Sequence, residues 1–246
     1  MRMCRAIPGL LAAFAITAAA SGAELKVFTA RAGTTVLEKI GPEFERATGH
    51  KLHVISGYGP AFVTRINGGE AFDILISGAA PIDGLIKNGK ISSDTRTNLM
   101  KSGMGVEVRA GAPKPDISSV ETFKRALLEA KSIGYLKTVN RVEQLVERLG
   151  LADSIKSKIT VPDTDIVSEL VAKGELELGI VVTTQIMTTS GVEFVGPLPP
   201  SIQYYIQFVA GISANSKAPD AARELLKFLN GPVAIPVLKS QGLEPG

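Results

Sequence analysis

The chain has 246 residues, with 27 lysines and arginines against 24 aspartates and glutamates. This near balance, without any basic run, argues against nucleic acid or a charged membrane surface as a partner. The absence of tryptophan and the few other aromatic residues argue against a site that stacks sugars. Cys4, His50 and His53 are too few for a conventional zinc site, and we expect no metal and no cofactor.

Residues 1–23 have the pattern of a secretory signal peptide. Arg2 and Arg5 form a basic start, Ile7–Ala20 is apolar, and Ser21-Gly22-Ala23 has the small residues of a cleavage site. The apolar run is too short and too rich in alanine for a membrane span, and a transit peptide or an uncleaved anchor fits less well. We therefore expect export to the periplasm, no membrane insertion, and a mature chain of 223 residues with no cysteine.

The segment Leu25–Ile40 predicts a strand, a sharp turn of small residues and a helix that begins at Thr34 and ends at Thr48. A helix start directs its unpaired N–H groups and its dipole at one spot, which favours an anion there. Arg31 adds a cation whose planar fork of donors suits oxyanions. This turn, with Arg31, Gly33 and Thr34, is therefore the predicted first half of an anion site.

Two other interpretations of this turn remain open. Arg31 could be a surface residue paired with Glu43 or Glu45. Thr34 and Thr35 could be helix N-caps, a role that does not prevent a hydroxyl from facing a ligand.

Two further strand–turn–helix units follow the first. The strand Lys51–Ser56 leads into Gly57-Tyr58-Gly59-Pro60, and the strand Phe72–Ser77 leads into Ser77-Gly78-Ala79. Three such units in succession predict an open parallel sheet, whose ligands lie outside the carboxyl ends of the strands. The turns therefore add four candidate ligand-binding residues: Tyr58, Gly59, Ser77 and Gly78.

The rest of the chain continues the alternation of strands and helices. Strands are predicted at Gly103–Arg109, Ser132–Lys137, Leu178–Thr183, Val192–Val195 and Gln203–Ser213. Helices are predicted from a capping box at Ser118 and Glu121, and over Val139–Leu149, Asp165–Lys173, Pro219–Leu229 and Val233–Ser240.

Candidate residues in this later part are fewer. Thr183 and Thr184 follow the end of a strand and are the best of them, with Thr138 a weaker one. Tyr205 lies where the return strand enters, and its direction is left open by the pattern.

Two long stretches without turns, Lys101–Ala110 and Pro200–Ser213, could each carry the chain between two halves. This pattern predicts an α/β protein of two lobes, with a ligand cleft that closes by a hinge motion. We place lobe 1 at residues 24–104 plus 207–246, and lobe 2 at residues 105–206.

Three segments, Val27–Leu52, Phe72–Ile91 and Val195–Pro245, resemble the periplasmic molybdate-binding proteins. These are solute receptors of ABC importers with the type II periplasmic binding protein fold. The most specific part is the strand before Ser216-Lys217-Ala218-Pro219, with its following helix and the closing Gly242-Leu243-Glu244-Pro245. The resemblance implies export, a small anionic ligand, an ABC permease as partner, and a monomer.

The site departs from the pattern of that family. Its members usually have a hydroxyl residue in the first turn, where this chain has Arg31-Ala32-Gly33, and serines in the second, where it has Tyr58. The usual tyrosine of the return strand falls near Phe208, with Tyr204 and Tyr205 close by. Arginine shifts the expected ligand from tetrahedral oxyanions toward carboxylates.

The sequence is therefore compatible with two functions. The first is a solute-binding protein that delivers a small anion, because the chain has no G-x-S-x-G motif and no metal-ligand cluster. The second follows from a further resemblance, to a branch that includes periplasmic aconitate isomerases. In that case Arg31 would clamp the substrate and Tyr58 would relay a proton.

Overall fold

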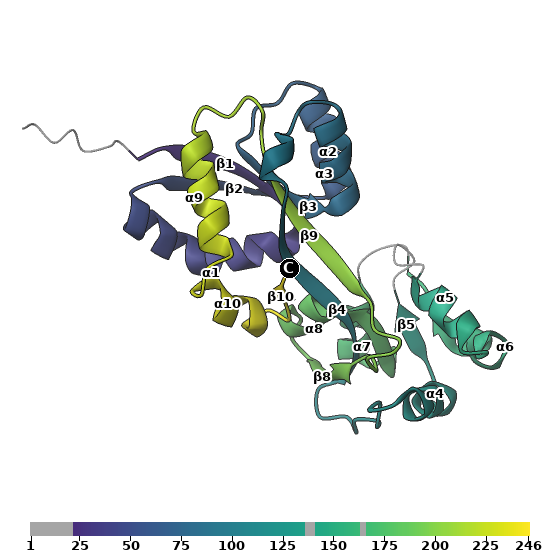
Figure 1. Cartoon of the computed structure of the whole chain (residues 1–246). Coiled ribbons are helices and arrows are strands. Elements are labelled where there is room, and N and C mark those ends of the chain that lie inside the picture. The colour runs from purple at the N-terminus through teal and green to yellow at the C-terminus, as the bar shows by residue number, and fades with distance from the viewer. Residues whose placement is uncertain (1–21, 136–140, 163–165) are drawn as a thin grey trace, which may run out of the picture.

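The computed structural model describes residues 22–135, 141–162 and 166–246. In Figure 1 the helices and strands form two groups, and two long strands run from one group into the other. The strands are β1 (Glu24–Thr29), β2 (Lys51–Ser56), β3 (Ile74–Gly78), β4 (Thr97–Arg109), β5 (Ile133–Tyr135), β6 (Ile159–Thr160), β7 (Leu178–Val182), β8 (Val192–Pro197), β9 (Tyr205–Ile212) and β10 (Glu244–Pro245). The α-helices are α1 (Arg31–Thr48), α2 (Gly59–Asn67), α3 (Ala79–Lys87), α4 (Val120–Glu129), α5 (Arg141–Arg148), α6 (Ala152–Ile155), α7 (Val167–Lys173), α8 (Thr183–Thr188), α9 (Pro219–Leu229) and α10 (Ala234–Ser240).

The first three strands pair in parallel, as predicted. Phe28 of β1 lies opposite Ile55 of β2 on one side and Leu75 of β3 on the other. The carboxyl ends of these strands therefore meet at one edge, where the turns into α1, α2 and α3 also lie.

The strands β4 and β9 join the two groups. The first part of β4 pairs antiparallel with β9, and its later part, Met104–Glu107, pairs antiparallel with β7. The strand β9 pairs in turn with β3, and β5 pairs in parallel with β7. The order across the sheet is β2-β1-β3-β9-β4-β7-β5-β6, so one pair of strands links both halves.

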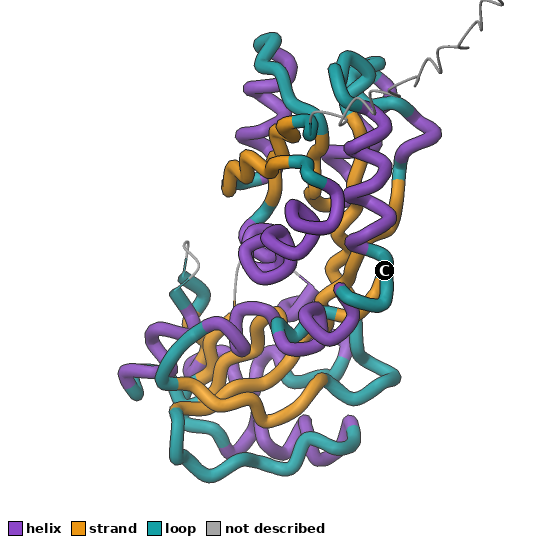
Figure 2. Tube along the Cα trace, turned by 90° about the vertical axis from the view of Figure 1, so that its left-hand side faces the viewer, coloured by secondary structure: helices purple, strands orange, loops and turns teal. Residues whose placement is uncertain are grey.

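Buried apolar side chains form separate clusters in the two halves. In the first, α1, α9 and α10 pack on one face of the sheet, and α2 and α3 pack on the other. In the second, one cluster joins α4 and α5 to β5 and β7, and a smaller one surrounds α7 and α8. Figure 2 shows strands flanked by helices in both halves, which confirms the predicted α/β architecture of two lobes.

The helix α1 begins three residues earlier than predicted. Ala30 is the N-cap, with an extended backbone, and Arg31 is already helical. The alternative interpretation of Thr34 and Thr35 as N-caps is therefore wrong. This start could not be predicted from a capping residue, because Ala30 has no side-chain oxygen with which to cap a helix.

The capping box of α4 is shifted by one residue from the predicted pair. The N–H of Thr122 donates to Ser119 Oγ at 3.1 Å, and the N–H of Ser119 donates to Thr122 Oγ1 at the same distance. Ser118 lies one residue earlier, and its N–H donates to Asp116 Oδ1. A threonine hydroxyl thus takes the place expected for the Glu121 carboxylate.

Several strand limits also differ from prediction. The strand β3 begins at Ile74, β4 extends back to Thr97, and β9 is confined to Tyr205–Ile212. The strand β7 ends at Val182, because Thr183 opens the short helix α8, which the sequence pattern did not predict. Parts of the predicted segments Ser132–Lys137, Val139–Leu149 and Asp165–Lys173 lie outside the described residues.

Candidate functional site

A cavity of about 250 Å³ lies between the two halves. It is small compared with sites for drug-sized ligands, which are roughly 300–1,000 Å³. The turns that follow β1 and β2 line it from the first half, and the end of β7 with α8 lines it from the second. Its lining residues are Ala30, Arg31, Ala32, Thr35, Gly57, Tyr58, Val182, Thr184, Gln185, Thr188 and Phe208.

The first turn of α1 supplies backbone donors to this cavity. The N–H of Ala30 donates to the Ile76 carbonyl, and that of Gly33 donates to the Ala30 carbonyl. The N–H groups of Arg31 and Ala32 have no acceptor among the described residues. Two free donors at the positive end of an 18-residue helix favour an anion at this end of the cavity.

The Arg31 side chain is exposed and makes no ion pair with any residue that the structure describes. Its proposed surface partner Glu45 is engaged elsewhere, with Lys51 Nζ at 2.9 Å and the Leu52 N–H at 2.9 Å. These bonds hold the pKa of Glu45 below its usual value. The cavity lining contains no carboxylate among the described residues, so the Arg31 charge is not neutralised there.

Two aromatic side chains border the cavity. Tyr58 is the N-cap residue of α2 and is 70 % exposed. Phe208 of β9 is partly buried and lies where the resemblance to molybdate-binding proteins placed a tyrosine. The return strand thus presents an apolar ring to the cavity where a hydroxyl was expected.

The short helix α8 supplies polar side chains from the second half. The N–H of Thr184 donates to Ser102 Oγ at 3.3 Å, and Thr188 Oγ1 donates to the Thr184 carbonyl at 2.8 Å. Gln185 also lines the cavity, and its Oε1 atom is buried without a donor among the described residues. The sequence prediction stopped at Thr184 and missed Gln185 and Thr188. The polar run Thr183-Thr184-Gln185 after a buried strand was the available signal.

Of the predicted residues, Arg31, Tyr58 and Thr184 lie together on the cavity. Gly33 and Gly59 instead allow close packing behind it. A Cβ atom at Gly33 would lie 2.0 Å from Thr29 Oγ1, and one at Gly59 would lie 2.5 Å from Ser77 Oγ.

The remaining first-half candidates are near the cavity without lining it. Thr34 Oγ1 donates to Ser56 Oγ at 2.9 Å, which joins the two turns. Ser77 is buried at the end of β3, and Gly78 is the N-cap of α3.

Thr183 holds three segments together instead of lining the cavity. Its hydroxyl lies 2.7 Å from the Gly242 carbonyl, 3.1 Å from the Gly103 carbonyl and 3.0 Å from Ser102 Oγ. The residue therefore ties α8 to β4 and to the segment that precedes β10.

Tyr205 lies elsewhere. It is 42 % exposed, Lys101 Nζ lies 4.8 Å from the centre of its ring, and it lines a separate cavity with several prolines. Thr138 lies outside the described residues.

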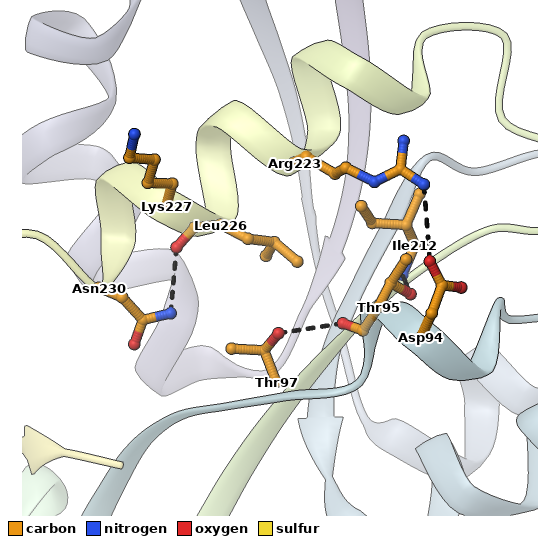
Figure 3. Close-up of a pocket in the computed structure, with 8 residues that line it drawn as sticks. All are labelled: Asp94, Thr95, Thr97, Ile212, Arg223, Leu226, Lys227 and Asn230. Atoms are coloured by element: carbon orange, nitrogen blue, oxygen red, sulfur yellow. Dashed lines mark hydrogen bonds and ion pairs between the residues drawn. The ribbon is translucent and has the colours of Figure 1, made fainter.

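Another cavity of about 250 Å³ is lined by residues of α9 and of the segment Asp94–Thr97 (Figure 3). Most of its polar groups already have partners among the described residues, and Lys227 is the exception. Arg223 pairs with Asp94 and Asp220, and Asn230 Nδ2 donates to the Leu226 carbonyl. The cavity on α1 and α8 combines a cation and free backbone donors with a lining that holds no carboxylate among the described residues, and it is therefore the better candidate for a ligand site.

Comparison with known proteins agrees with this architecture. The sequence matches the family of bacterial extracellular solute-binding proteins over residues 25–244. This chain therefore belongs to that family, whose members act outside the cytoplasm. No helix of the described residues is long and apolar enough to cross a membrane.

Two characterised relatives narrow the class. The chain is 30 % identical to an aconitate isomerase of a Pseudomonas species, over 96 % of this chain and 93 % of that protein. It is 29 % identical to the molybdate-binding protein ModA of Azotobacter vinelandii, over 94 % of each chain. The protein is thus a solute-binding protein similar both to molybdate receptors and to aconitate isomerase.

Solved structures show the same fold. A substrate-binding domain assigned to a molybdenum ABC transporter of Clostridium difficile gives a TM-score of 0.80 at 20 % identity, over 92 % of this chain and all of that one. The periplasmic molybdate-binding protein of Azotobacter vinelandii gives 0.69 at 21 % identity, over 90 % and 99 %. The predicted fold, a type II periplasmic binding protein with a cleft between two α/β lobes, is confirmed.

Proposed function

We propose that the protein is a periplasmic receptor that binds a small carboxylate anion between α1 and α8 and delivers it to an ABC permease. The observation that carries this proposal is the unpaired Arg31 guanidinium, on a cavity without a carboxylate among its described residues. A bound carboxylate would receive a bidentate pair from Arg31 and N–H bonds from the first turn of α1.

The choice of a carboxylate over molybdate or sulfate follows from the shape of arginine. Its planar fork matches two carboxylate oxygens, whereas tetrahedral oxyanions are well held by neutral N–H and O–H donors. The hydroxyl-rich turns expected of a molybdate site are replaced here by Arg31 and Tyr58.

Titration calorimetry of the mature protein tests this proposal. The panel contains citrate, cis-aconitate and trans-aconitate, together with molybdate, tungstate and sulfate. We expect binding to at least one carboxylate and weaker binding to the inorganic oxyanions. If no small anion binds, the proposed function is wrong, and if only molybdate or tungstate binds, the choice of a carboxylate is wrong.

A second candidate function is favoured by the 30 % identity to an aconitate isomerase. A proton shift along aconitate needs a base near the substrate carbon and a cation that stabilises the developing enolate. Among the described lining residues, only Arg31 and Tyr58 carry titratable side chains. Arg31 would clamp a carboxylate and Tyr58 would move the proton, and the lack of a stronger base makes this the second candidate.

Proton NMR separates the two candidates. The protein is mixed with trans-aconitate at high concentration, and the signals of the cis isomer are followed over time. Appearance of the cis isomer at a rate that scales with protein concentration would establish catalysis. Binding of trans-aconitate without turnover would support the receptor function and contradict the isomerase function.

Export and the importer partner complete the proposal. Removal of residues 1–23 would release the mature chain into the periplasm as a monomer. Cell fractionation, with mass measurement of the exported form, tests the location and the cleavage site together. Light scattering of the same sample tests the monomeric state, and ligand uptake in a strain that lacks the candidate permease tests the partner.

A further inference from the structure

Gln185 has an amide oxygen that lacks a partner, at the site where the ligand is proposed to bind. Its Oε1 atom is buried, and none of the described residues donates to it. Leaving a buried polar atom unpaired is destabilising, because the atom loses its hydrogen bonds to water and gains none in return. Such an atom beside a cavity indicates that a donor from a bound molecule completes the site.

None of the described polar groups nearby donates to this oxygen, and two of the hydroxyls are already engaged. The Thr188 hydroxyl donates to the Thr184 carbonyl at 2.8 Å, and the Thr35 hydroxyl donates to the Ala32 carbonyl at 3.0 Å. Both hydroxyl protons are therefore committed to helix backbone. The last side-chain torsion of glutamine is broad, so a modest rotation can present Oε1 to a group in the cavity.

The two ends of the cavity thus differ in what they require from a ligand. Arg31 and the free N–H groups of α1 are donors and require an acceptor with negative charge. Gln185, on the opposite wall, offers an acceptor and requires a donor. A fully ionised oxyanion has acceptor oxygens only and cannot donate to the Oε1 atom of Gln185.

We infer that the ligand is a hydroxycarboxylate, with a carboxylate bound by Arg31 and a hydroxyl that donates to Oε1 of Gln185. This inference rests on the proposed function and specifies its ligand class. Gln185 then acts as the specificity-determining residue that distinguishes a hydroxylated acid from the same acid without the hydroxyl. A site built around a ligand hydroxyl rejects the analogue that lacks it, because a buried protein group is then left unpaired.

Matched pairs of ligands test the inference in wild-type protein. Citrate and propane-1,2,3-tricarboxylate differ only by a hydroxyl, as do malate and succinate. We expect the wild-type protein to bind the hydroxylated member of at least one pair about tenfold more tightly, the effect of a hydrogen bond worth roughly 1.4 kcal/mol. Calorimetry provides both dissociation constants under one condition.

The variant Gln185→Met then assigns the preference to this residue. Methionine has a similar length but no amide, so the ratio of the two dissociation constants should fall to within about twofold. Affinity for the member without the hydroxyl should change little. Gln144→Met is the matched control, because Gln144 is exposed on α5, outside the cavity, and this variant should keep the wild-type ratio.

Each outcome has a distinct meaning. If the wild-type protein shows no preference in either pair, or if the preference survives in Gln185→Met, the inference is wrong while the proposed function stands. If neither member of either pair binds, the proposed function fails, and the inference fails with it. Gln185→Leu replaces Gln185→Met if circular dichroism shows that the methionine variant is unfolded.

Discussion

Arg31 lies on a cavity wall where its charge has no partner among the described residues. A guanidinium that made a structural ion pair would be satisfied without a ligand, as Arg65 is with Glu70 at 2.6 and 2.7 Å. The contrast between these two arginines indicates that Arg31 is available for binding while Arg65 stabilises the fold.

Substitution of Arg31 should therefore affect binding far more than stability. We expect Arg31→Ala to weaken carboxylate binding tenfold or more, because a charge-assisted bidentate pair is worth about 1.5–3 kcal/mol. Arg31→Lys keeps the charge but loses the planar fork of donors, so its affinity should lie between those of wild type and Arg31→Ala. Calorimetry gives the affinities, and thermal unfolding checks the fold. An unchanged affinity in Arg31→Ala would show that Arg31 is a surface residue that does not contact the ligand.

Glu70 provides a prediction on acid stability. Bonds from Arg65 and from Lys26 Nζ, at 2.9 Å, lower the pKa of Glu70 to about 2 from an ordinary 4.5. A depressed folded-state pKa stabilises the protein above pH 4.5, and that contribution is lost as the pH falls toward 2.

We therefore expect Glu70→Gln to destabilise the protein near neutral pH, and the difference from wild type to shrink between pH 4.5 and 2. Urea unfolding at several pH values in this window measures it. Glu224→Gln is the control, since His50, at 3.2 Å, is the only ion-pair partner of this exposed carboxylate among the described residues. A difference between Glu70→Gln and wild type that does not change with pH would contradict the assignment.

Some of these residue-level features could be predicted from the sequence. Arg31, Tyr58 and Thr184 each follow the end of a strand, and parallel sheets bring such positions together. The role of Gln185 could not be predicted, because it depends on whether one amide oxygen finds a donor in the folded chain. The same limit applies to Thr183, whose hydroxyl donates to the Gly242 carbonyl and which does not line the cavity.

At the level of elements, the first turn of α1 depends on a glycine. Gly33 packs against β1, and a Cβ atom there would lie 2.0 Å from Thr29 Oγ1, a fully buried side chain. The absence of a side chain allows the helix to start close to the strand, which places the free N–H groups of Arg31 and Ala32 at the cavity.

We expect Gly33→Ala to destabilise the protein by about 1–3 kcal/mol, the usual cost of overpacking a well-packed site. Gly84→Ala is the matched control, because Gly84 is exposed inside α3 and a Cβ atom there would have no neighbour within 4 Å. That change should stabilise by about 0.5–1 kcal/mol, since alanine is the better helix former. Denaturant unfolding of both variants compares them, and equal effects would contradict the packing argument.

The elements also show where sequence patterns succeed and fail. The regular units β1–α1, β2–α2 and β3–α3 follow from apolar strands separated by glycine-rich turns, and α9 has the predicted bounds. The missed helix α8 is only six residues long, too short to show a helical period. The start of α1 was misplaced because tertiary packing of Gly33, and not a capping side chain, decides it.

At the scale of the whole molecule, the last residues of the chain reach the second half through Thr183. Its hydroxyl bridges the Gly242 and Gly103 carbonyls, and β10 pairs with β4 next to this contact. The end of the chain is thus bound to the same strand that connects the two halves. The lobe boundaries predicted at residues 104/105 and 206/207 fall on β4 and β9, and they remain predictions.

Loss of the Thr183 hydroxyl should reduce the stability of the folded protein. We expect Thr183→Val to lower the free energy of unfolding by about 1–3 kcal/mol, because the Gly242 carbonyl, 2.7 Å away, loses its hydroxyl donor while the shape of the side chain is kept. Thr64→Val is the control, since the exposed Thr64 hydroxyl donates only to a carbonyl of its own helix, and it should change stability by less than about 0.5 kcal/mol. Equal melting temperatures for the two variants would show that the Thr183 bridge contributes nothing.

Tyr58 gives the molecule one further property. The chain contains no tryptophan, and Tyr58 is a large, 70 % exposed aromatic residue at the rim of the cavity. A tryptophan introduced at this position would be the sole indole of the protein, so its fluorescence would report on the cavity without background. Ligand entry and the motion of the two halves could then be followed optically in real time, with a probe that differs from the native ring by only a few atoms.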